Sequence, residues 1–343
     1  MKPARILIIK LSSLGDVIHS LPTLTAIRRA YPEAHIAWVV GPRAAEIVAR
    51  HPGVDSVYGL GIAGERAGRL VPLPSLLAAV RTLRAERFDI SLDLQGLFRT
   101  ACLAFAVGAP QRVGFRGFQE GAFLLCNRRV IPEREDIHAV HGYLQFARHV
   151  GADDSTAEFG LREEPQDKEW VEVFLAAEPG TAPLVAIAPG ASSLRKRWST
   201  SRFAETACAL RIRGARVVVV GSAADATVSD RICSASGAED LCGRTSLPQL
   251  AALLRRCALF VGNDSGPLHL AAAVGAPCLA LFGPTNPLRT GPFGNHMVLS
   301  ASGASWASEI AASDVVKAAE AILAGCAELV HKQNEQKATH TAD

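Results

Sequence analysis

Residues 260–277 read FVGNDSGPLHLAAAVGAP, a pattern typical of one strand-to-helix connection in a parallel α/β sheet. The apolar start predicts a buried strand, and the NDSG turn leads into a helix with Pro267 in its first turn. Unpaired amides at such a helix start favour an anion, here a pyrophosphate. A well-capped helix with Ser265 as N-cap is the competing interpretation, but it does not explain Asp264 and His269 beside the turn.

Short apolar runs alternate with helical patterns on both sides of this stretch. The alternation predicts parallel sheets covered by helices on both faces, which is a Rossmann-like arrangement. The rhythm lapses around residues 110–135, and residues 151–183 have the composition of a linker around one short helix. A last helix is expected over residues 307–323. The predicted strands lie in RILIIKL, AHIAWVV, DSVYGL, FDISLDL, LVAIAP, ARVVVVG, CALFVGND and PCLALFG.

The chain has 343 residues, which is too long for one ordinary hydrophobic core, so two domains are expected. We place an N-terminal Rossmann-like domain at 1–165 and a second at 166–326, with the last helix packing on its own domain or back on the first. A disordered polar tail is expected over 327–343. Two such domains should face a central cleft, with ligands at the carboxyl ends of the strands.

Composition narrows the class of protein. Apolar residues make up 49% and charged residues 20% of the chain, and no apolar run is long enough to cross a bilayer. Eight cysteines without a CxxC pair indicate reduced thiols in a cytosolic protein. Residues 1–132 hold 17 Lys and Arg against 9 Asp and Glu. This basic half indicates either an anionic partner or a solvated arginine-rich surface.

The loop KLSSLGDVIHSLP, residues 10–22, places a carboxylate at an expected helix start. Ser13 and Asp16 have the spacing of a capping box. An ionised Asp16 at a cleft edge would also serve as a general base for a hydroxyl nucleophile. Gly15 would let a ligand approach the backbone closely. The residues alone leave both roles open.

Two further loops follow predicted strands in the second half. In APGASSLRKRWS, residues 188–199, small residues precede three basic ones, so backbone amides, hydroxyls and Lys196 would hold phosphate oxygens. An exposed basic turn is the alternative, although Trp198 should pin the loop by packing. In VVVVGSAADATVSDRI, Asp225 at a helix start suits a ribose hydroxyl, as in dinucleotide folds. That signal is weak alone, because no GxGxxG follows this strand.

Other motifs with known chemistry are missing from the sequence. There is no GxxxxGK[ST], HExxH, D-x-D or closely spaced Cys/His set, so we expect no metal site. A GxSxG elbow is absent too, which argues against a serine hydrolase. A sugar-nucleotide epimerase or dehydrogenase would need a GxGxxG in the first strand-to-helix turn of a dinucleotide-binding unit, and neither RILIIKLSSLG nor LVAIAPGASS has one.

Taken together, KLSSLGDVIHSLPTL, LDLQGLFRTA, RKRW and NDSGPLHLAAAVGAPCLALFGPTNP resemble the ADP-heptose:lipopolysaccharide heptosyltransferases, over roughly residues 5–323. The resemblance implies a GT-B fold and an inverting, metal-independent glycosyl transfer without a cofactor. The ADP-heptose donor would bind the C-terminal half, and an anionic lipopolysaccharide precursor the N-terminal half. The motifs are similar to both heptosyltransferases I and II, so the acceptor is Kdo-lipid A or the first heptose.

The resemblance also implies roles for individual residues. Asp16 matches the base, Lys196 a lysine near the donor diphosphate, and Asp225 an acidic residue for the ribose. Asp264, Ser265, Gly266 and His269 match the loop that would meet the diphosphate and the heptose, and Thr245 falls near the adenine site. The expected donor-binding residues are Ser192, Ser193, Lys196, Asp225, Thr245, Asp264, Ser265, Gly266 and His269. The expected acceptor-binding residues are Ser13, Gly15, Arg66, Arg69 and Gln95.

Two alternatives remain at this point: another nucleotide-sugar donor or acceptor within the same family, and a non-catalytic nucleotide-binding protein that would have no use for Asp16. We expect no nucleic-acid partner. The expected location is cytoplasmic, with peripheral contact to the cytoplasmic face of the inner membrane.

Overall fold

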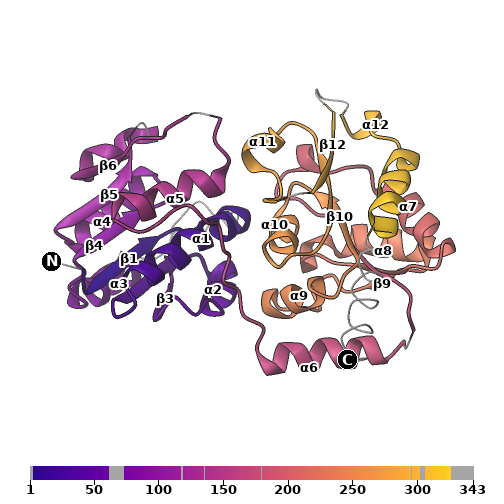
Figure 1. Cartoon of the computed structure of the whole chain (residues 1–343), viewed down its shortest axis with the longest axis horizontal. Coiled ribbons are helices and arrows are strands. Elements are labelled where there is room, and N and C mark those ends of the chain that lie inside the picture. Colours follow the sequence, from indigo (N-terminus) through magenta and orange to yellow (C-terminus); the bar gives the residue numbers. More distant parts are fainter. Residues whose placement is uncertain are drawn as a thin grey trace, which may run out of the picture. The chain divides into compact units, whose positions relative to one another are not determined.

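The chain divides into two compact units, Met1–Glu164 and Pro165–Asp343, each built around a six-stranded parallel sheet (Figure 1). The computed structural model describes residues 3–61, 73–116, 119–134, 136–178, 180–294, 296–301 and 306–325. Arg66, Arg69 and the tail at 327–343, for which the sequence raised expectations, lie outside the described residues.

The sheet of the first unit has the strand order β3-β2-β1-β4-β5-β6. The two central strands, β1 and β4, pair in parallel, and the chain leaves them toward opposite edges of the sheet. The strands are β1 (Arg5–Ile9), β2 (His35–Val40), β3 (Ser56–Gly59), β4 (Ile90–Asp93), β5 (Gln111–Phe115) and β6 (Arg128–Val130).

Helices cover both faces of this sheet, as the uninterrupted apolar strands require. Leu7 and Ile9 of β1 pack with Leu83 and Leu103, which lie on α3 and α4. Ile6 and Ile8, which alternate with them along β1, are also fully buried and face the opposite side of the sheet. There α1 and α5 pack against each other. The helical segments are α1 (Leu14–Ala30), α2 (Pro42–Ala49), α3 (Leu73–Ala85), α4 (Phe98–Val107), the 3₁₀ segment η1 (Gln119–Leu125) and α5 (Ala139–His149).

The second unit repeats this plan with the strand order β12-β11-β10-β7-β8-β9. Here β7 and β10 are the central pair, and every residue of both strands is buried. The strands are β7 (Leu184–Ala188), β8 (Arg216–Val219), β9 (Glu239–Asp240), β10 (Leu259–Asn263), β11 (Cys278–Phe282) and β12 (Met297–Ser300).

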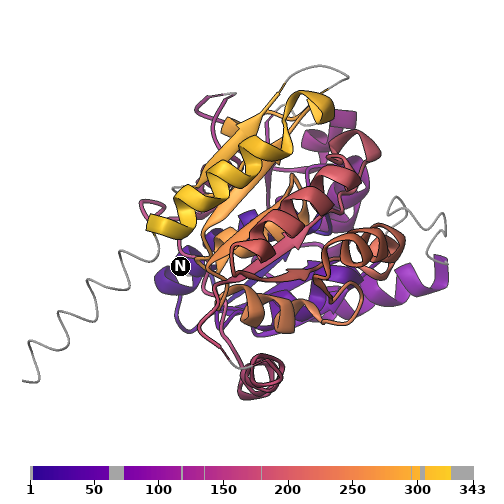
Figure 2. The same ribbon diagram turned by 90° about the vertical axis from the view of Figure 1, so that its right-hand side faces the viewer.

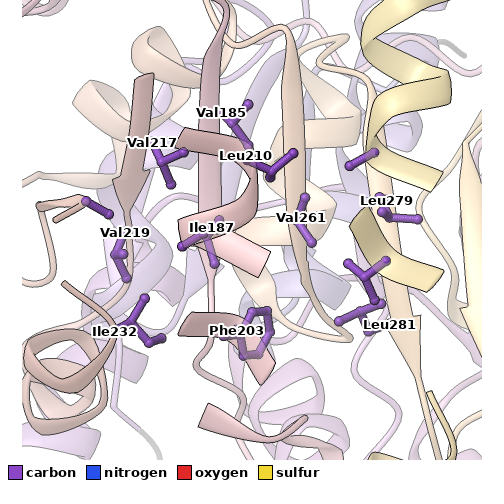
Figure 3. Close-up of a cluster of buried hydrophobic side chains, with 14 of the residues drawn as sticks. Val185, Ile187, Phe203, Leu210, Val217, Val219, Ile232, Val261, Leu279 and Leu281 are labelled. Atoms are coloured by element: carbon purple, nitrogen blue, oxygen red, sulfur yellow. The ribbon is translucent and has the colours of Figure 1, made fainter. Parts of the chain in front are cut away.

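One face of this second sheet carries a large hydrophobic core (Figure 3). Phe203, Leu210 and Ile232 from the helical layer pack onto alternate strand residues such as Ile187 and Leu281. A helix over 312–325 adds to the same core, and Figure 2 shows it in yellow beside α7. The helical segments are α6 (Pro165–Ala176), η2 (Leu194–Lys196), α7 (Thr200–Ile212), η3 (Ala223–Asp225), α8 (Ala226–Ser236), α9 (Leu247–Leu254), α10 (Gly266–Ala273), α11 (Pro287–Thr290) and α12 (Trp306–Glu309).

The expected α/β fold is confirmed, and the structure adds strands that the sequence patterns missed. No strand is predicted within residues 110–135, but β5 and β6 lie there. Their glycine and arginines interrupt the apolar pattern near the sheet edge. The strands β9 and β12 are also missed, because they lie at or beside an edge and are only partly buried or exposed. The single last helix expected at 307–323 is two helices, broken at Ile310 and Ala311.

No helix in the described part of the chain combines the length and apolar character needed to cross a membrane.

A buried histidine joins distant segments of the first unit. The Nδ1 atom of His51 accepts a hydrogen bond from the Gly53 amide at 2.9 Å, so Nε2 carries the proton and donates it to Thr25 Oγ1, also at 2.9 Å. The Thr25 hydroxyl donates in turn to the Glu158 carbonyl. Burial, with the charges of Arg162 and Arg28 nearby, lowers the pKa of His51 from 6.5 to about 4. The folded protein therefore holds this ring neutral.

We predict that the free energy of unfolding decreases as the pH falls from about 6.5 to about 4, because the unfolded chain binds a proton at His51 that the folded chain excludes. The decrease from this group approaches about 3 kcal/mol. In His51→Gln the same pH change should cost measurably less, although the variant is less stable at neutral pH. Urea unfolding of both proteins across this range measures the difference, and parallel pH curves would contradict the assignment.

Candidate functional site

The expected donor residues gather at the carboxyl edge of the second sheet. The connections after β7 and β10 leave toward opposite edges, so a gap opens between the ends of these two strands. Ligands bind at such a position in open α/β sheets. Lys196 follows β7, and Asp264 follows β10 directly.

Asn263 holds the two loops at this gap. Its Oδ1 atom accepts a hydrogen bond from the Trp198 amide at 2.9 Å, and its Nδ2 donates to the Pro189 carbonyl at 2.8 Å. Trp198 is buried, and its indole donates to the Ile310 carbonyl. The loop is pinned by packing, as expected from Trp198. A fully buried amide with both groups paired fixes the distance between the β7 and β10 loops.

Asp264 is the centre of a charged cluster. Its Oδ2 accepts hydrogen bonds from Lys196 Nζ at 2.6 Å and from the Thr285 hydroxyl at 2.7 Å. His269 Nε2 lies 3.3 Å from the other oxygen, Oδ1. Burial acts to raise the pKa of Asp264, but the hydrogen bonds from His269 and Lys196 outweigh it and lower this pKa to about 2. The carboxylate is therefore ionised at physiological pH and holds Lys196 in place.

The turn before α10 offers neutral hydrogen-bond donors. Ser265 occupies the N-cap position, as the competing interpretation expected, but its side chain makes no capping hydrogen bond. The Ser265 hydroxyl is buried and has no hydrogen-bond partner among the described residues. The helix begins at Gly266, and the first amides of a helix have no acceptor within it. A hydroxyl and amides left unsatisfied together are suited to binding an anion.

Asp225 is already held by protein groups. Its Oδ2 accepts from the amide and the hydroxyl of Ser222, at 3.1 and 2.8 Å, and its Oδ1 accepts from Arg197 at 3.1 Å. Arg197 also donates to the carbonyl of Ala191. A Cβ atom on Gly190 would lie 2.7 Å from this carboxylate, so a glycine is needed there. Asp225 is thus fixed between the loops after β7 and β8.

The remaining expected donor residues lie around this edge with fewer contacts. Ser192 is exposed, and the Ser193 hydroxyl accepts a hydrogen bond from the Arg195 amide at 3.3 Å. Thr245 is half-buried, just before α9. Their roles in donor binding stay predictions.

In the first unit, Asp16 lies in the first turn of α1 after the carboxyl end of β1. Its Oδ2 accepts from the amide and the hydroxyl of Ser13, at 3.0 and 2.7 Å, which confirms the expected capping interaction. The Tyr143 hydroxyl donates to Oδ1 at 3.3 Å. Asp16 is half-buried, while Gly15 is buried beneath it in the helix. Oδ2 is therefore engaged by the cap, while Oδ1 faces the Tyr143 hydroxyl.

Gln95, expected at the acceptor site, braces this loop. Its Oε1 accepts from the amides of Leu11 and Ser12, both at 3.0 Å, which ties the loop after β1 to the loop after β4. Beneath lies the buried Lys10, with its Nζ 4.8 Å from the centre of the Tyr143 ring. Burial lowers the pKa of Lys10, and the charges of Asp16 and Asp93 oppose this.

Sequence reasoning missed several residues of both sites. Thr285 lies in the Pro-rich loop GPTNP, and no local pattern marks its hydroxyl as a donor to Asp264. Lys10 directly follows the apolar run RILII, and a charged residue at that position could have indicated a site at the strand end. Tyr143 is distant in sequence, and no local pattern links it to Asp16. Among the described residues, no three His, Cys, Asp or Glu side chains form a group able to hold a metal ion.

Comparison with known proteins places this architecture. The model of glycosyltransferase family 9 (heptosyltransferase) matches residues 76–318. Lipopolysaccharide heptosyltransferase 1 of Pseudomonas aeruginosa is 34% identical over 86% of this chain and 82% of its own length. Two solved structures of the E. coli heptosyltransferase WaaC, one with ADP and one with ADP-2-deoxy-2-fluoro heptose, are both 27% identical. They cover 93% and 92% of this chain and 99% of their own, with TM-scores of 0.78 and 0.75.

Two Rossmann-like units of this kind, matched along their length, define a glycosyltransferase of the GT-B fold. The chain belongs to glycosyltransferase family 9, the heptosyltransferase family.

We predict that Ser265→Ala separates stability from nucleotide binding. The buried hydroxyl has no partner to lose, so the free energy of unfolding should stay constant or increase slightly. Affinity for ADP should fall about tenfold, because one hydrogen bond to a charged oxygen is lost. Isothermal titration calorimetry and urea unfolding measure the two effects.

The Ser246→Ala variant is the matched control for stability. The Ser246 hydroxyl does cap its helix by accepting from the Gln249 amide at 3.2 Å. Its loss should cost about 1 kcal/mol. If Ser265→Ala were equally destabilising, its hydroxyl would be a structural cap rather than a ligand group.

Proposed function

We propose that this enzyme transfers a heptose from ADP-L-glycero-D-manno-heptose to the inner core of lipopolysaccharide. The observation that carries the proposal is the edge of the second sheet, where an unsatisfied Ser265 hydroxyl, the α10 amides and Lys196 lie together. Family membership supports the reaction class. The solved relatives carry ADP and an ADP-heptose analogue, which supports the choice of donor.

The second unit would bind and activate the donor. As the glycosidic bond breaks, negative charge develops on the leaving ADP. Lys196 and the amides after Asp264 would stabilise that charge, which lowers the barrier electrostatically. Asp264 would not repel the diphosphate strongly, because its charge is balanced by Lys196 at 2.6 Å and it is further bonded by Thr285. Asp225, beside the same edge, would accept from a ribose hydroxyl.

The first unit would supply the base. Asp16 Oδ1 takes the proton of the acceptor hydroxyl as that oxygen attacks the anomeric carbon, while Ser13 keeps the carboxylate oriented through Oδ2. A single displacement of this kind inverts the configuration at the anomeric carbon. No residue forms a covalent intermediate, and we propose that no metal takes part.

The acceptor would be Kdo-lipid A or the first heptose of the core, and in either case the acceptor molecule carries anionic carboxylates and phosphates. The arginine-rich first half of the chain fits such a partner by charge. The finer location that this implies is the cytoplasmic face of the inner membrane.

Mass spectrometry of the product tests the proposal. The enzyme is incubated with ADP-heptose and either a Kdo-lipid A acceptor or one already carrying a first heptose. A mass increase of one heptose on either acceptor is the expected result. Consumption of another nucleotide sugar, with none of ADP-heptose, would show a different donor. Binding of ADP-heptose without any transfer would indicate a non-catalytic protein.

We predict that Asp16→Asn lowers kcat about a hundredfold or more, because the amide cannot accept the acceptor proton. The amide oxygen can still accept from Ser13, so the cap and the free energy of unfolding should change little. Donor affinity should also stay near normal. Steady-state transfer rates and ADP-heptose titrations measure these quantities.

Ser13→Ala is the matched control, because it removes one hydrogen bond to Asp16 but leaves the carboxylate. Its effect on kcat should be much smaller. An Asp16→Asn enzyme that keeps its rate would leave capping as the only role of this residue.

A further inference from the structure

Exposed apolar side chains lie on the first unit, on elements that carry none of the residues assigned to catalysis. Phe98 and Phe105, seven residues apart on α4, share one face of that helix, and they are 47% and 56% exposed. Leu124 of η1 is 70% exposed. The segment η1 packs along α4, and the exposed side chains of Phe98, Phe105 and Leu124 on these two elements are here called the α4–η1 surface.

Two contacts fix the direction in which η1 runs along α4. At one end, the Phe98 amide donates to the Glu120 carboxylate at 3.2 Å. At the other end, the Arg112 guanidinium lies 5.3 Å from the centre of the Phe105 ring and donates to the Leu125 carbonyl. These contacts fix η1 against α4, and the Phe105 ring is stacked beneath the Arg112 guanidinium.

Basic residues surround the α4–η1 surface. Arg129 lies 5.3 Å from the centre of the Phe123 ring on η1, and neither Arg129 nor Arg112 has an ion-pair partner among the described residues. The helices α3 and α4 contain three arginines and no acidic residue. On η1 the one acidic residue, Glu120, is used by the Phe98 amide. The surface thus combines protruding apolar groups with unbalanced positive charge.

We propose that the α4–η1 surface docks the enzyme on an anionic phospholipid bilayer. Phe98, Phe105 and Leu124 would enter the interface between headgroups and acyl chains, and Arg112 and Arg129 would contact lipid phosphates. Arginines stacked on aromatic rings suit this position, since the ring enters the apolar layer while the guanidinium stays at the phosphates.

A bilayer fits this surface better than a protein partner does. The apolar side chains protrude singly from helices, and the unpaired cations match a continuous sheet of phosphates. This argument rests in part on the proposed function, because an acceptor anchored by lipid A keeps its sugars at a bilayer surface. Phe98 also follows β4 by five residues, on the edge where Gln95 braces the Asp16 loop. Docking there would bring that edge to the surface that carries the acceptor.

Vesicle sedimentation of the full chain, without substrates, tests the proposal. The probes are vesicles of phosphatidylcholine mixed with phosphatidylglycerol and vesicles of phosphatidylcholine alone. The protein should bind the anionic vesicles more tightly, and high salt should weaken this binding. The affinity of the double variant F98S/F105S for these vesicles should be lower by a factor of about ten or more. Arg129→Gln should lose about fivefold on anionic vesicles only.

Matched controls come from apolar residues elsewhere that are more exposed than Phe98 and Phe105. Val173 on α6 and Ile212 on α7 are 68% and 79% exposed, and Val173→Ser and Ile212→Ser should leave vesicle binding unchanged. Leu124→Ser is a second test variant that keeps both rings and the Arg112 contact. Thermal unfolding checks that each variant is folded.

The outcomes separate this proposal from the proposed function. Equal losses in the control variants, or unchanged binding in F98S/F105S and Leu124→Ser, would overturn the docking surface even if heptose transfer is found. A change of oligomeric state in these variants, with no change in vesicle binding, would make the surface an interface between copies. If F98S/F105S and Leu124→Ser lose vesicle binding while the unmodified protein transfers no heptose, the docking surface is supported and the proposed function is rejected.

F98S/F105S should also transfer to a water-soluble, delipidated acceptor at the normal rate. Its rate on acceptor embedded in anionic vesicles should fall in parallel with vesicle binding. Equal losses on both acceptors would contradict docking, because they would indicate damage to the site itself.

Discussion

In both units, the structure depends on one constraint, which is that two central parallel strands end side by side while their connections diverge. The gap between the strand ends must be held by polar side chains, because loop backbone groups there need partners. Gln95 does this in the first unit, with one oxygen accepting two amides of the β1 loop. Asn263 does it in the second, pairing with the loop after β7 through both ends of its amide. The candidate site residues lie on the loops that Gln95 and Asn263 hold in place.

The two edges differ in their electrostatics. In the second unit, the Asp264 carboxylate is surrounded by Lys196, Thr285 and His269, so it contributes little net negative charge. The attraction for an anion then comes from neutral amides and a hydroxyl that need no rearrangement. In the first unit, Asp16 accepts hydrogen bonds from Ser13 at Oδ2 and from the hydroxyl of Tyr143 at Oδ1. In the proposed reaction, the edge of the second unit stabilises negative charge and the edge of the first unit accepts a proton.

Sequence patterns predicted the α/β fold and the strand-end loops on which the candidate site residues lie, because buried parallel strands are nearly continuous apolar runs. They missed β6 and β9, since short edge strands have no such run. The capping pair of Ser13 and Asp16 was readable from local spacing. The contact from Tyr143 was not, because it joins residues 127 positions apart through the packing of α5 on α1. Likewise, spacing suggested a cap at Ser265 but could not show that its hydroxyl is unpaired.

The tight approach of Gly190 to Asp225 limits how this family member can diverge. Any side chain at position 190 would collide with the carboxylate, and the carboxylate is also bonded to Arg197 and Ser222. A lineage could therefore replace this glycine only after shortening or losing the acidic side chain, and the reverse order would pass through a damaged protein. Positions 190 and 225 are therefore expected to vary together among descendants of this sequence.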